Sequence, residues 1–572
     1  MRNLHVGRAT WLLSLFVLVT PIFGLAGGHH HAQPVSDVAA ADEPQESPEV
    51  ASIVNRVIAS ENLYSVKMMG FSPRIETYVQ YYQPDNELGD VATNDSTFLG
   101  RLKFDGEGKE ISFVPTSTPD WFVRHNPTKV MGSKPHLQLN GFAMEALMVD
   151  EHNFDRKHYT FQPVRWEYLG DVRCLVIDVR PRANEEEGAF QGRIWVEDHD
   201  FAVVRLNGTR VRPAKGSFYV HFDCWRENLQ PGEWLPVYVY SQETDLGKAL
   251  RYKSETRLWG YDLTAHHGQQ EWTTIQVDAP APIQDNSEHT TDLSPVESAR
   301  QMNMEAEQNV LDRLERARLI APAGSVDKVL ETVVNNLRVT NKLDGLPPVQ
   351  CRVMMTSSLE SFSLAYTIVL SRGLIDVLPD EASLAMVLSH ELAHIALGHK
   401  LDPKYAFNDR LIVSDEDLLS HLDFTRPQTD EVAADAKGVE FLKNSPYKAN
   451  LAQAGLFLRA AAEAAPRVPH MFGAHMGNGL TEGKDDVIRM SSLITAAPEL
   501  KARNVDQISA LPLGSRLQVN AWDGSVVFTD RKAVALVDAG EKMPFRVTPI
   551  IPYLRVYTQT SKSDVSAQNL AH

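Results

Sequence analysis

The sequence predicts an α+β protein: a mainly helical domain with a small sheet, preceded by an antiparallel, curved β domain and followed by a small β extension. Three observations carry this prediction. Short alternating runs of apolar and polar residues fill positions 54–278, a long run with helical periodicity covers 380–399, and strand-like runs return near position 516. With 572 residues, the chain is also too long for a single hydrophobic core, so several domains are expected.

The composition restricts the classes of partner. The formal net charge of −18 leaves no basic excess to neutralise phosphates, which argues against a nucleic-acid partner, and it equally disfavours docking on anionic lipid. The 3 cysteines, Cys174, Cys224 and Cys351, are too few for a disulfide framework. We expect buried free thiols, with a Cys174–Cys224 disulfide as the alternative.

The N-terminal region has the features of an export signal. Two arginines precede an apolar run at residues 9–28, in which small residues are placed as a cleavage site requires. Residues 1–28 are therefore predicted to be a signal peptide, and residues 29–50, rich in Ala, Pro and acidic residues, a flexible tether. The expected location is the periplasm of a Gram-negative-type bacterium. An uncleaved N-terminal anchor is the alternative, because the run is nearly long enough to span a bilayer.

Residues 51–280 are predicted to form the β domain. Val, Tyr, Trp and Phe recur in short alternating segments that Gly, Pro, Asn and Asp separate, as in an antiparallel curved sheet with one apolar face. Clear examples are residues 193–196, 201–205, 218–222 and 234–240.

The segment GRIWVEDHDFAVVRL, within residues 100–265, resembles the LolA-like lipoprotein-carrier sheet. The resemblance implies a half-barrel whose concave apolar surface holds lipid, lipoprotein or an unfolded polypeptide. From the residues themselves we favour the other interpretation, a structural domain whose aromatic residues are ordinary core.

Residues 281–325 begin as a Pro-rich linker and continue as a helix with a solvated face. Residues 326–503 are expected to form the mainly helical domain, which starts with a helix at Val326–Val339. Two strands, Val349–Met355 and Leu364–Leu370, precede the long helix of this domain. If the second strand is a sheet edge, it could pair with an extended substrate backbone.

The long helix begins after Asp380, a suitable N-cap, and carries the motif HELAH at residues 390–394. Histidines four residues apart point the same way on a helix, so His390 and His394 can share one metal ion, with Glu391 beside them. This is the layout of a zinc hydrolase, in which bound zinc lowers the pKa of a water to about 7 and polarises a carbonyl. Glu391 is then the candidate general base.

A second helix, with Thr429 as its predicted N-cap, places Glu431 and Asp435 on one face. A zinc site with two histidines needs a carboxylate from another helix as third ligand, and a further carboxylate to orient a ligating imidazole. Glu431 and Asp435 suit these two roles. The alternative is the solvated acidic face that is common in the first turn of a helix.

The order HELAH, then EVAAD, resembles the pattern HExxH, then ExxAD, of the CAAX prenyl protease (Ste-type) peptidase family and its bacterial HtpX-type and BepA-type relatives. Residues 359–364 and 371–374 also resemble the family's entry to the metal helix. The likeness covers about residues 326–500. It implies a zincin-type protease domain.

The resemblance also implies the roles of individual residues. One Zn²⁺ per chain would be bound by His390, His394 and Glu431. Glu391 would activate water, and Asp435 would support a histidine.

Two departures from the family pattern affect the expected site. Where relatives carry Asn near the start of the edge strand and a Pro-Gly-Gly turn, this chain has Glu360-Ser361 and Ala365-Tyr366. Relatives also place a histidine before a proline downstream, and an arginine beyond it.

The nearest counterparts of those two residues are His475, which lacks the proline, and Arg489. The resemblance makes His475 a candidate catalytic residue that hydrogen-bonds the oxyanion or takes the fourth zinc position. It makes Arg489 a candidate supporting residue of the site. His470 is a weaker candidate, and an exposed loop histidine is the alternative for His475.

His399 is predicted to be structural. On a straight helix it lies on the opposite side from His390, so the two cannot bind one ion. Its spacing also differs from that of proteases with a third histidine ligand on an extended motif.

The remaining chain is expected to hold a helix at 452–465, a shorter helix near 486–494, and a hairpin whose strands flank the turn at 522–524. Residues 504–572 form the predicted β extension, which ends in a disordered tail.

The expected function is an exported zinc endopeptidase that hydrolyses peptide bonds with water activated by Glu391. By family resemblance, its substrates are misfolded or stalled envelope proteins. The alternative is a non-proteolytic periplasmic chaperone, or a lipid or polypeptide carrier, with a gated or vestigial metal site; a membrane-tethered sheddase is a third. Polypeptide substrates are the expected partners, with lipid or lipoprotein at the β domain and peripheral membrane association as further expectations.

Overall fold

The computed structural model describes most of residues 49–572, which form one compact unit. The predicted signal peptide, most of the tether and the C-terminal tail lie outside the described residues. In the described part, no helix is both long and apolar enough to cross a membrane. The described ranges are 47–85, 89–103, 109–112, 146–182, 188–211, 220–243, 251–263, 295–400, 424–482, 487–501, 517–519, 525–528, 547 and 553–557.

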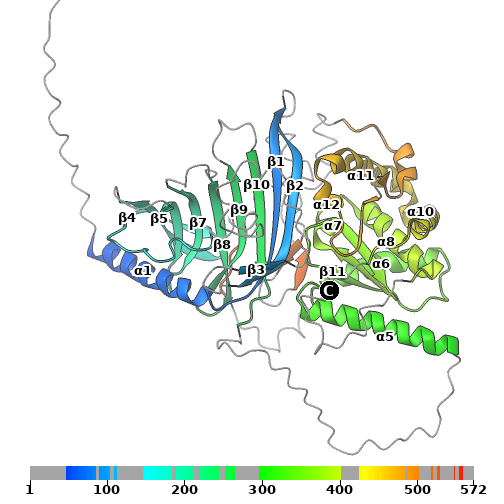
Figure 1. Cartoon of the computed structure of the whole chain (residues 1–572), viewed down its shortest axis with the longest axis horizontal. Helices are drawn as coiled ribbons and strands as arrows, with labels where there is room; N and C mark the ends of the chain where they lie inside the picture. The colour runs from blue at the N-terminus through cyan, green and yellow to red at the C-terminus, as the bar shows by residue number, and fades with distance from the viewer. Residues whose placement is uncertain are drawn as a thin grey trace, which may run out of the picture. The chain divides into compact units, whose positions relative to one another are not determined.

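Among these residues, ten strands form one antiparallel sheet in the order β3-β2-β1-β10-β9-β8-β7-β6-β5-β4 (Figure 1). Strands β4 to β10 follow one another as a meander, and β1 pairs with β10, so the N-terminal hairpin extends the same sheet. The predicted antiparallel, curved β region is confirmed. Its strands are β1 Arg74–Asp85, β2 Gly89–Lys103, β3 Lys109–Ser112, β4 Tyr159–Leu169, β5 Val172–Pro181, β6 Phe190–Glu197, β7 Val203–Arg210, β8 Val220–Gln230, β9 Glu233–Glu243 and β10 Arg251–Trp259.

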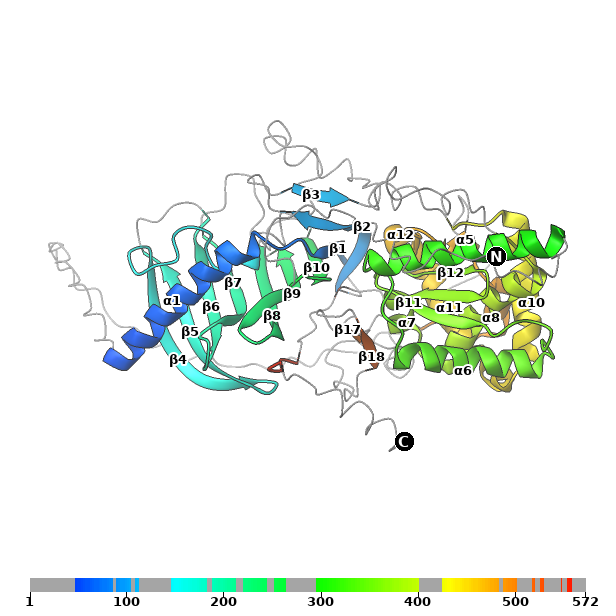
Figure 2. The same ribbon diagram turned by 90° about the horizontal axis from the view of Figure 1, so that it is seen from below.

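A helix, α1 (Pro48–Met68), lies across one face of this sheet (Figure 2). The prediction of strand texture from residue 54 onward was wrong here. Val54, Val57 and Tyr64 recur at helical spacing and are buried against the sheet, and their β-branched and aromatic character disguised the helix. Glu61 of α1 also forms a fully buried ion pair with Arg226 of β8, at 2.7 Å.

The other face of the sheet contributes to the core of the helical region. Along β5, Val172, Cys174 and Val176 belong to this second core, whereas Leu175 and Ile177 face α1. The period of two along the strand therefore buries both faces. All three cysteines are buried free thiols, as predicted.

The helical region contains a second sheet, with strand order β11-β13-β12-β14. β13 (Thr367–Ser371) lies between β11 (Gln350–Met354), which is parallel to it, and β12 (Glu360–Leu364), which is antiparallel. The predicted strand Leu364–Leu370 was therefore wrong in extent and in position, because a hairpin turn interrupts it at Ala365, where φ is +47°. β13 is an interior strand, and β12 is the one nearer the edge.

Helices pack around this sheet, which confirms the α+β class. They are α5 Pro295–Arg316, α6 Ser325–Thr340, α7 Arg372–Val377, α8 Glu381–Leu397, α10 Gln428–Lys443, α11 Leu451–Ala464 and α12 Pro469–Phe472, with 3₁₀ helices η2 Pro446–Asn450, η3 Ala465–Arg467 and η4 Ser491–Ala496. The remaining described strands are the short β14 Asn478–Gly479 of the second sheet and two short pairs, β15 Thr481–Glu482 with β16 Val487–Ile488 and β17 Leu517–Val519 with β18 Val526–Phe528.

Two predicted helix details are wrong. α10 begins at Gln428 after an N-cap at Pro427, so Thr429 lies within the first turn and is not the cap. The expected helix near 486–494 is a strand followed by a 3₁₀ helix, because Met490 adopts a left-handed conformation that an α-helix cannot contain. The predicted hairpin at the C-terminal side is confirmed as β17–β18.

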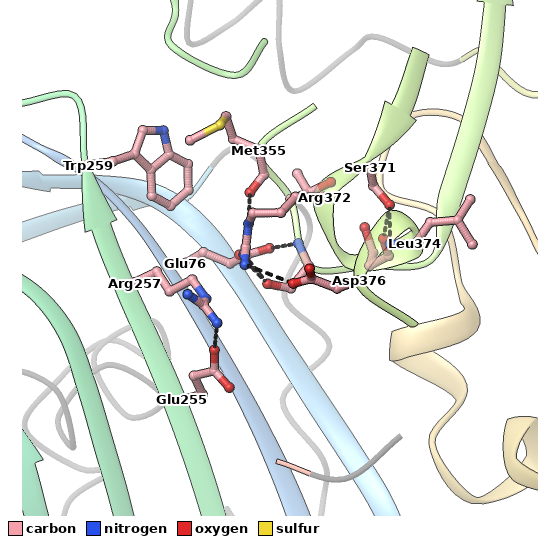
Figure 3. A network of polar contacts seen from close by, with 12 residues as sticks. Glu76, Glu255, Arg257, Trp259, Met355, Ser371, Arg372, Leu374 and Asp376 are labelled. Carbon is pink, nitrogen blue, oxygen red and sulfur yellow. Dashed lines mark hydrogen bonds and ion pairs between the residues drawn. The ribbon is translucent and has the colours of Figure 1, made fainter. Parts of the chain in front are cut away.

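Buried polar contacts join the large sheet to the helical region (Figure 3). Arg372 Nη2 of α7 lies 3.2 Å from Glu76 Oε2 of β1, and Arg372 Nε donates to the Met355 carbonyl at 3.3 Å. Beside them, Arg257 and Glu255 of β10 form an ion pair. Removing one partner of a buried pair leaves an uncompensated charge, at a cost of roughly 3–5 kcal/mol. Arg372 and Glu76 in the junction therefore each depend on a buried partner.

Candidate metal centre

The helix α8 holds the HELAH motif inside the core. Asp380 caps its first turn by accepting a hydrogen bond from Ser383 N at 2.7 Å, and Gly398 ends it in a left-handed conformation with φ of 72°. The side chains of His390, Glu391 and His394 are buried. The predicted helix start and the common face of the two imidazoles are therefore present.

The helix α10 brings a carboxylate to the two imidazoles. Glu431 Oε2 lies 3.1 Å from His390 Nε2 and 3.6 Å from His394 Nε2, and the two ring nitrogens are 3.1 Å apart. Tetrahedral zinc with bonds of about 2.0–2.2 Å separates its ligand atoms by roughly 3.3 Å. The three donor atoms therefore fit a metal ion, and these residues form a group that could hold one.

Small residues allow α10 to approach α8. Ala434 is fully buried, and a Cβ on Gly438 would lie 3.2 Å from the backbone N and Cα of His390. The two helices can lie this close only because the side chains at these positions are small. Their separation in turn sets the distance between Glu431 and the two histidines.

Burial and nearby carboxylates act in opposite directions on the two imidazoles. His390 Nδ1 lies 2.8 Å from Asp435 Oδ1. Burial alone disfavours protonation, but hydrogen bonding to Asp435 and Glu431 outweighs it and raises the pKa of His390 to about 9. Burial likewise disfavours the charged form of Glu431, yet hydrogen bonds from His390 and His394 hold its pKa well below the usual range. For His394, burial lowers the pKa.

Ser361 was not anticipated as a partner of Glu391. Ser361 Oγ on β12 donates to Glu391 Oε1 at 2.7 Å, whereas Oε2 is buried and has no hydrogen-bond partner among the described residues. One oxygen is thus held and the other remains available to accept a proton. The departure of this strand from the family pattern at Glu360-Ser361 marks it as unusual but does not identify the contact with Glu391.

His399 lies closer to the site than expected. The straight-helix argument fails because α8 ends at Leu397, and the turn at Gly398 places His399 Nδ1 2.9 Å from His394 Nδ1. His399 therefore contacts the ring nitrogen of His394 that faces away from Glu431. Within the described residues, it does not belong to the group that could hold a metal.

Arg489 and Met490 contact three of the site residues. Arg489 Nη1 lies 2.8 Å from His390 Nε2 and also hydrogen-bonds Glu431 Oε2, and Met490 N donates to Asp435 Oδ2 at 2.8 Å. The predicted proximity of Arg489 to the ligands is present.

The other two candidate histidines are placed differently. His475 is not in the potential metal group; its backbone N–H donates to Glu360, and its ring Nε2 is buried without a partner in the described part of the chain. His470 lies 3.0 Å from Asp95 of the large sheet, through Nδ1. The structure thus brings together six of the predicted residues: His390, Glu391, His394, Glu431, Asp435 and Arg489.

With this geometry established, a comparison with protein families adds one finding. Residues 322–407 match the model of peptidase family M48. The match contains HELAH and supports a metalloprotease. It ends before Glu431 and Asp435, so the completion of the donor group by α10 is an independent observation. A search of curated proteins found no match to the chain.

Solved structures with partial likeness are distant. A DUF1329 family protein from Desulfovibrio piger has a TM-score of 0.22 at 10% identity, covering 37% of this chain and 92% of its own. A LolA superfamily protein from Nitrosomonas europaea has a TM-score of 0.17 at 11% identity, covering 38% and 96%. The MucA/MucB complex of Pseudomonas aeruginosa gives 0.13 at 10% identity, covering 37% and 94%.

Proposed function

We propose that the protein is a zinc-dependent endopeptidase. The observation that carries the proposal is the buried triangle of His390 Nε2, His394 Nε2 and Glu431 Oε2. Beside it lies Glu391, one of whose oxygens has no hydrogen-bond partner among the described residues. The M48 match over the first part of this site supports the same chemistry.

When bound by these three residues, zinc would supply a Lewis acid that polarises a peptide carbonyl and lowers the pKa of water. The protein's own groups perform the proton transfers. Glu391 accepts the proton of the attacking water at Oε2 and returns it to the leaving amine. Ser361 keeps Glu391 oriented through Oε1, and Asp435 fixes the ring of His390 through Nδ1.

The finer parts of the proposal concern substrate and place. We infer that the enzyme is an HtpX-type or BepA-type relative, exported to a Gram-negative-type periplasm through residues 1–28, and that it cleaves misfolded or stalled envelope proteins. The apolar run at residues 9–28 and the two metal motifs support this reading.

The substitution Glu391→Gln tests the mechanism, because it keeps the size of the side chain and removes its basicity. We expect loss of casein cleavage, with the zinc content of the protein unchanged. Glu463→Gln on α11, at an exposed position, is the matched control and should cleave like the wild type. Full activity of the Glu391→Gln protein would refute the assigned role.

A carrier without proteolytic activity is the second candidate, with lipid or polypeptide held on the large sheet. A row of aromatic residues on one sheet face, including Trp195, Trp225 and Trp234, favours it, although in the structure these side chains are buried. A carrier has no need of Glu391. Lipid that co-purifies with the protein, together with no turnover of casein by a zinc-loaded sample, would establish this alternative.

A further inference from the structure

The edge strand of the small sheet is occupied by the chain itself. An extended substrate commonly binds a protein by adding a strand to a sheet edge. Here β14 pairs with β12 in antiparallel register, Glu360 opposite Gly479 and Ser361 opposite Asn478. Further along β12, Arg426 Nη2 donates to the Ser363 carbonyl at 2.7 Å. Backbone groups beside the candidate metal centre are therefore already paired.

The segment that covers this edge is residues 469–482, which we call the cover segment. Its first anchor is the buried carboxylate of Glu360. Glu360 Oε2 accepts backbone hydrogen bonds from His475, Met476 and Gly477 at 2.9, 2.9 and 3.0 Å. Three such bonds to one charged oxygen fix the path of the cover segment, since hydrogen bonds to charged groups are stronger than neutral ones.

Close packing supports this anchor. A Cβ on Gly477 would lie 2.6 Å from Phe362 Cδ1 and 2.8 Å from the Ser361 carbonyl. Only glycine lets the cover segment approach β12 so closely.

The second anchor comes from the large sheet. Asp95 of β2 is fully buried. Its Oδ1 accepts from His470 N at 2.9 Å, and its Oδ2 accepts from Met471 N at 2.7 Å. Asp95 and His470 are 375 positions apart in the sequence, so this contact joins two distant parts of the chain.

A series of buried hydrogen bonds leads away from Asp95 along the large sheet. Tyr78 OH donates to Asp95 Oδ2 at 3.0 Å, Gln80 Nε2 donates to Tyr78 OH at 2.9 Å, and Tyr82 OH donates to Gln80 Oε1 at 2.5 Å. Val547 N also donates to Gln80 Oε1, at 2.7 Å. The position of Asp95 is thus set by side chains on the sheet face that belongs to the shared core.

We propose that the cover segment is an autoinhibitory element and that the large sheet keeps it closed through Asp95. A polypeptide reaches the edge of β12 only when β14 leaves it. Release of Asp95 from His470 and Met471 therefore increases the fraction of molecules that accept substrate. This inference rests on the proposed endopeptidase function, and it assigns the large sheet a regulatory role in that function.

Two substitutions open the cover segment by unrelated means. Asp95→Asn removes the charge that holds its start, and Gly477→Ala introduces the clash with Phe362. If each shifts the closed-to-open equilibrium by about 1.4 kcal/mol, the open fraction rises tenfold. Controls are Asp90→Asn on the same strand, whose partner is Arg251, and Gly345→Ala, where an added Cβ meets nothing within 4 Å.

The experiment has two readouts on the full chain. The first readout is the hydrogen exchange of peptides within 469–482, measured on zinc-loaded protein that carries Glu391→Gln and therefore does not depend on cleavage. The second readout is kcat/KM for casein, measured on protein in which Glu391 is intact. We expect about tenfold increases in both for Asp95→Asn and Gly477→Ala, and no change in either control.

If residues 469–482 exchange at the wild-type rate in both Asp95→Asn and Gly477→Ala, the proposal is overturned. Faster exchange over the whole chain would also overturn it, because Asp95 would then stabilise the fold in general. Faster local exchange with unchanged kcat/KM in an active enzyme would also overturn it. If local exchange is faster in the two variants but the wild type cleaves no casein, the large sheet does hold the cover segment, and the proposed endopeptidase function is wrong.

Discussion

At the scale of single residues, the site depends on contacts that sequence spacing reveals only in part. His390, Glu391 and His394 follow from the HExxH spacing, and Glu431 follows from the need for a third ligand on a second helix. Ser361 could not be predicted, because its contact with Glu391 depends on the register of the β12–β13 hairpin.

Ser361→Ala tests whether this contact orients the base. Loss of a hydrogen bond to a charged group costs about 1.5–3 kcal/mol, so kcat for casein should fall roughly ten- to a hundredfold. Zinc content should stay at the wild-type level, and Ser361→Thr should restore much of kcat because it restores the hydroxyl. An unchanged kcat in Ser361→Ala would mean that Glu391 needs no support from β12.

At the scale of elements, the sequence predicted regular segments well and irregular ones poorly. α6, α8 and α11 lie within a few residues of their predicted ranges. α1 was missed because its apolar face is built from residues that also favour strands. The division of Leu364–Leu370 into two strands depends on a left-handed turn at Ala365, a residue type that gives no turn signal.

The anchoring of α12 by the large sheet leads to a prediction about pH. The hydrogen bond to Asp95 raises the pKa of His470 above its usual value of about 6.5, although burial opposes this. A pKa that is higher in the folded state stabilises the fold fully below the unfolded value, and the stabilisation is lost as pH rises through the folded value. The cover segment should therefore open more readily above that pH.

Hydrogen exchange of residues 469–482 in the Glu391→Gln protein, corrected for intrinsic rates, measures this effect. When the cover segment carries no substitution, its exchange rate should rise as the pH is raised from 6.5 to values above the pKa of His470. His470→Gln should remove the pH dependence, since the other described groups that donate to Asp95 are the hydroxyl of Tyr78 and two backbone amides. The same pH profile in His470→Gln would assign the effect to another group.

At the scale of the whole molecule, the large sheet and the helical region share one core and a buried ionic junction at Arg372 and Glu76. The sequence predicted both regions but not their connection. Contacts such as Asp95–His470 join residues hundreds of positions apart, and the local sequence around either residue does not predict the contact. Through these contacts the large sheet can act on the cover segment, as the proposed role of Asp95 requires.

The central claim is that α8 and α10 together form a zinc site. X-ray absorption at the zinc edge of the full-length protein tests it most directly. The account predicts one zinc per chain with two imidazole nitrogens at about 2.0–2.1 Å and a carboxylate oxygen. Protein that retains no zinc after loading and dialysis, or zinc whose spectrum lacks two imidazole ligands, would contradict it.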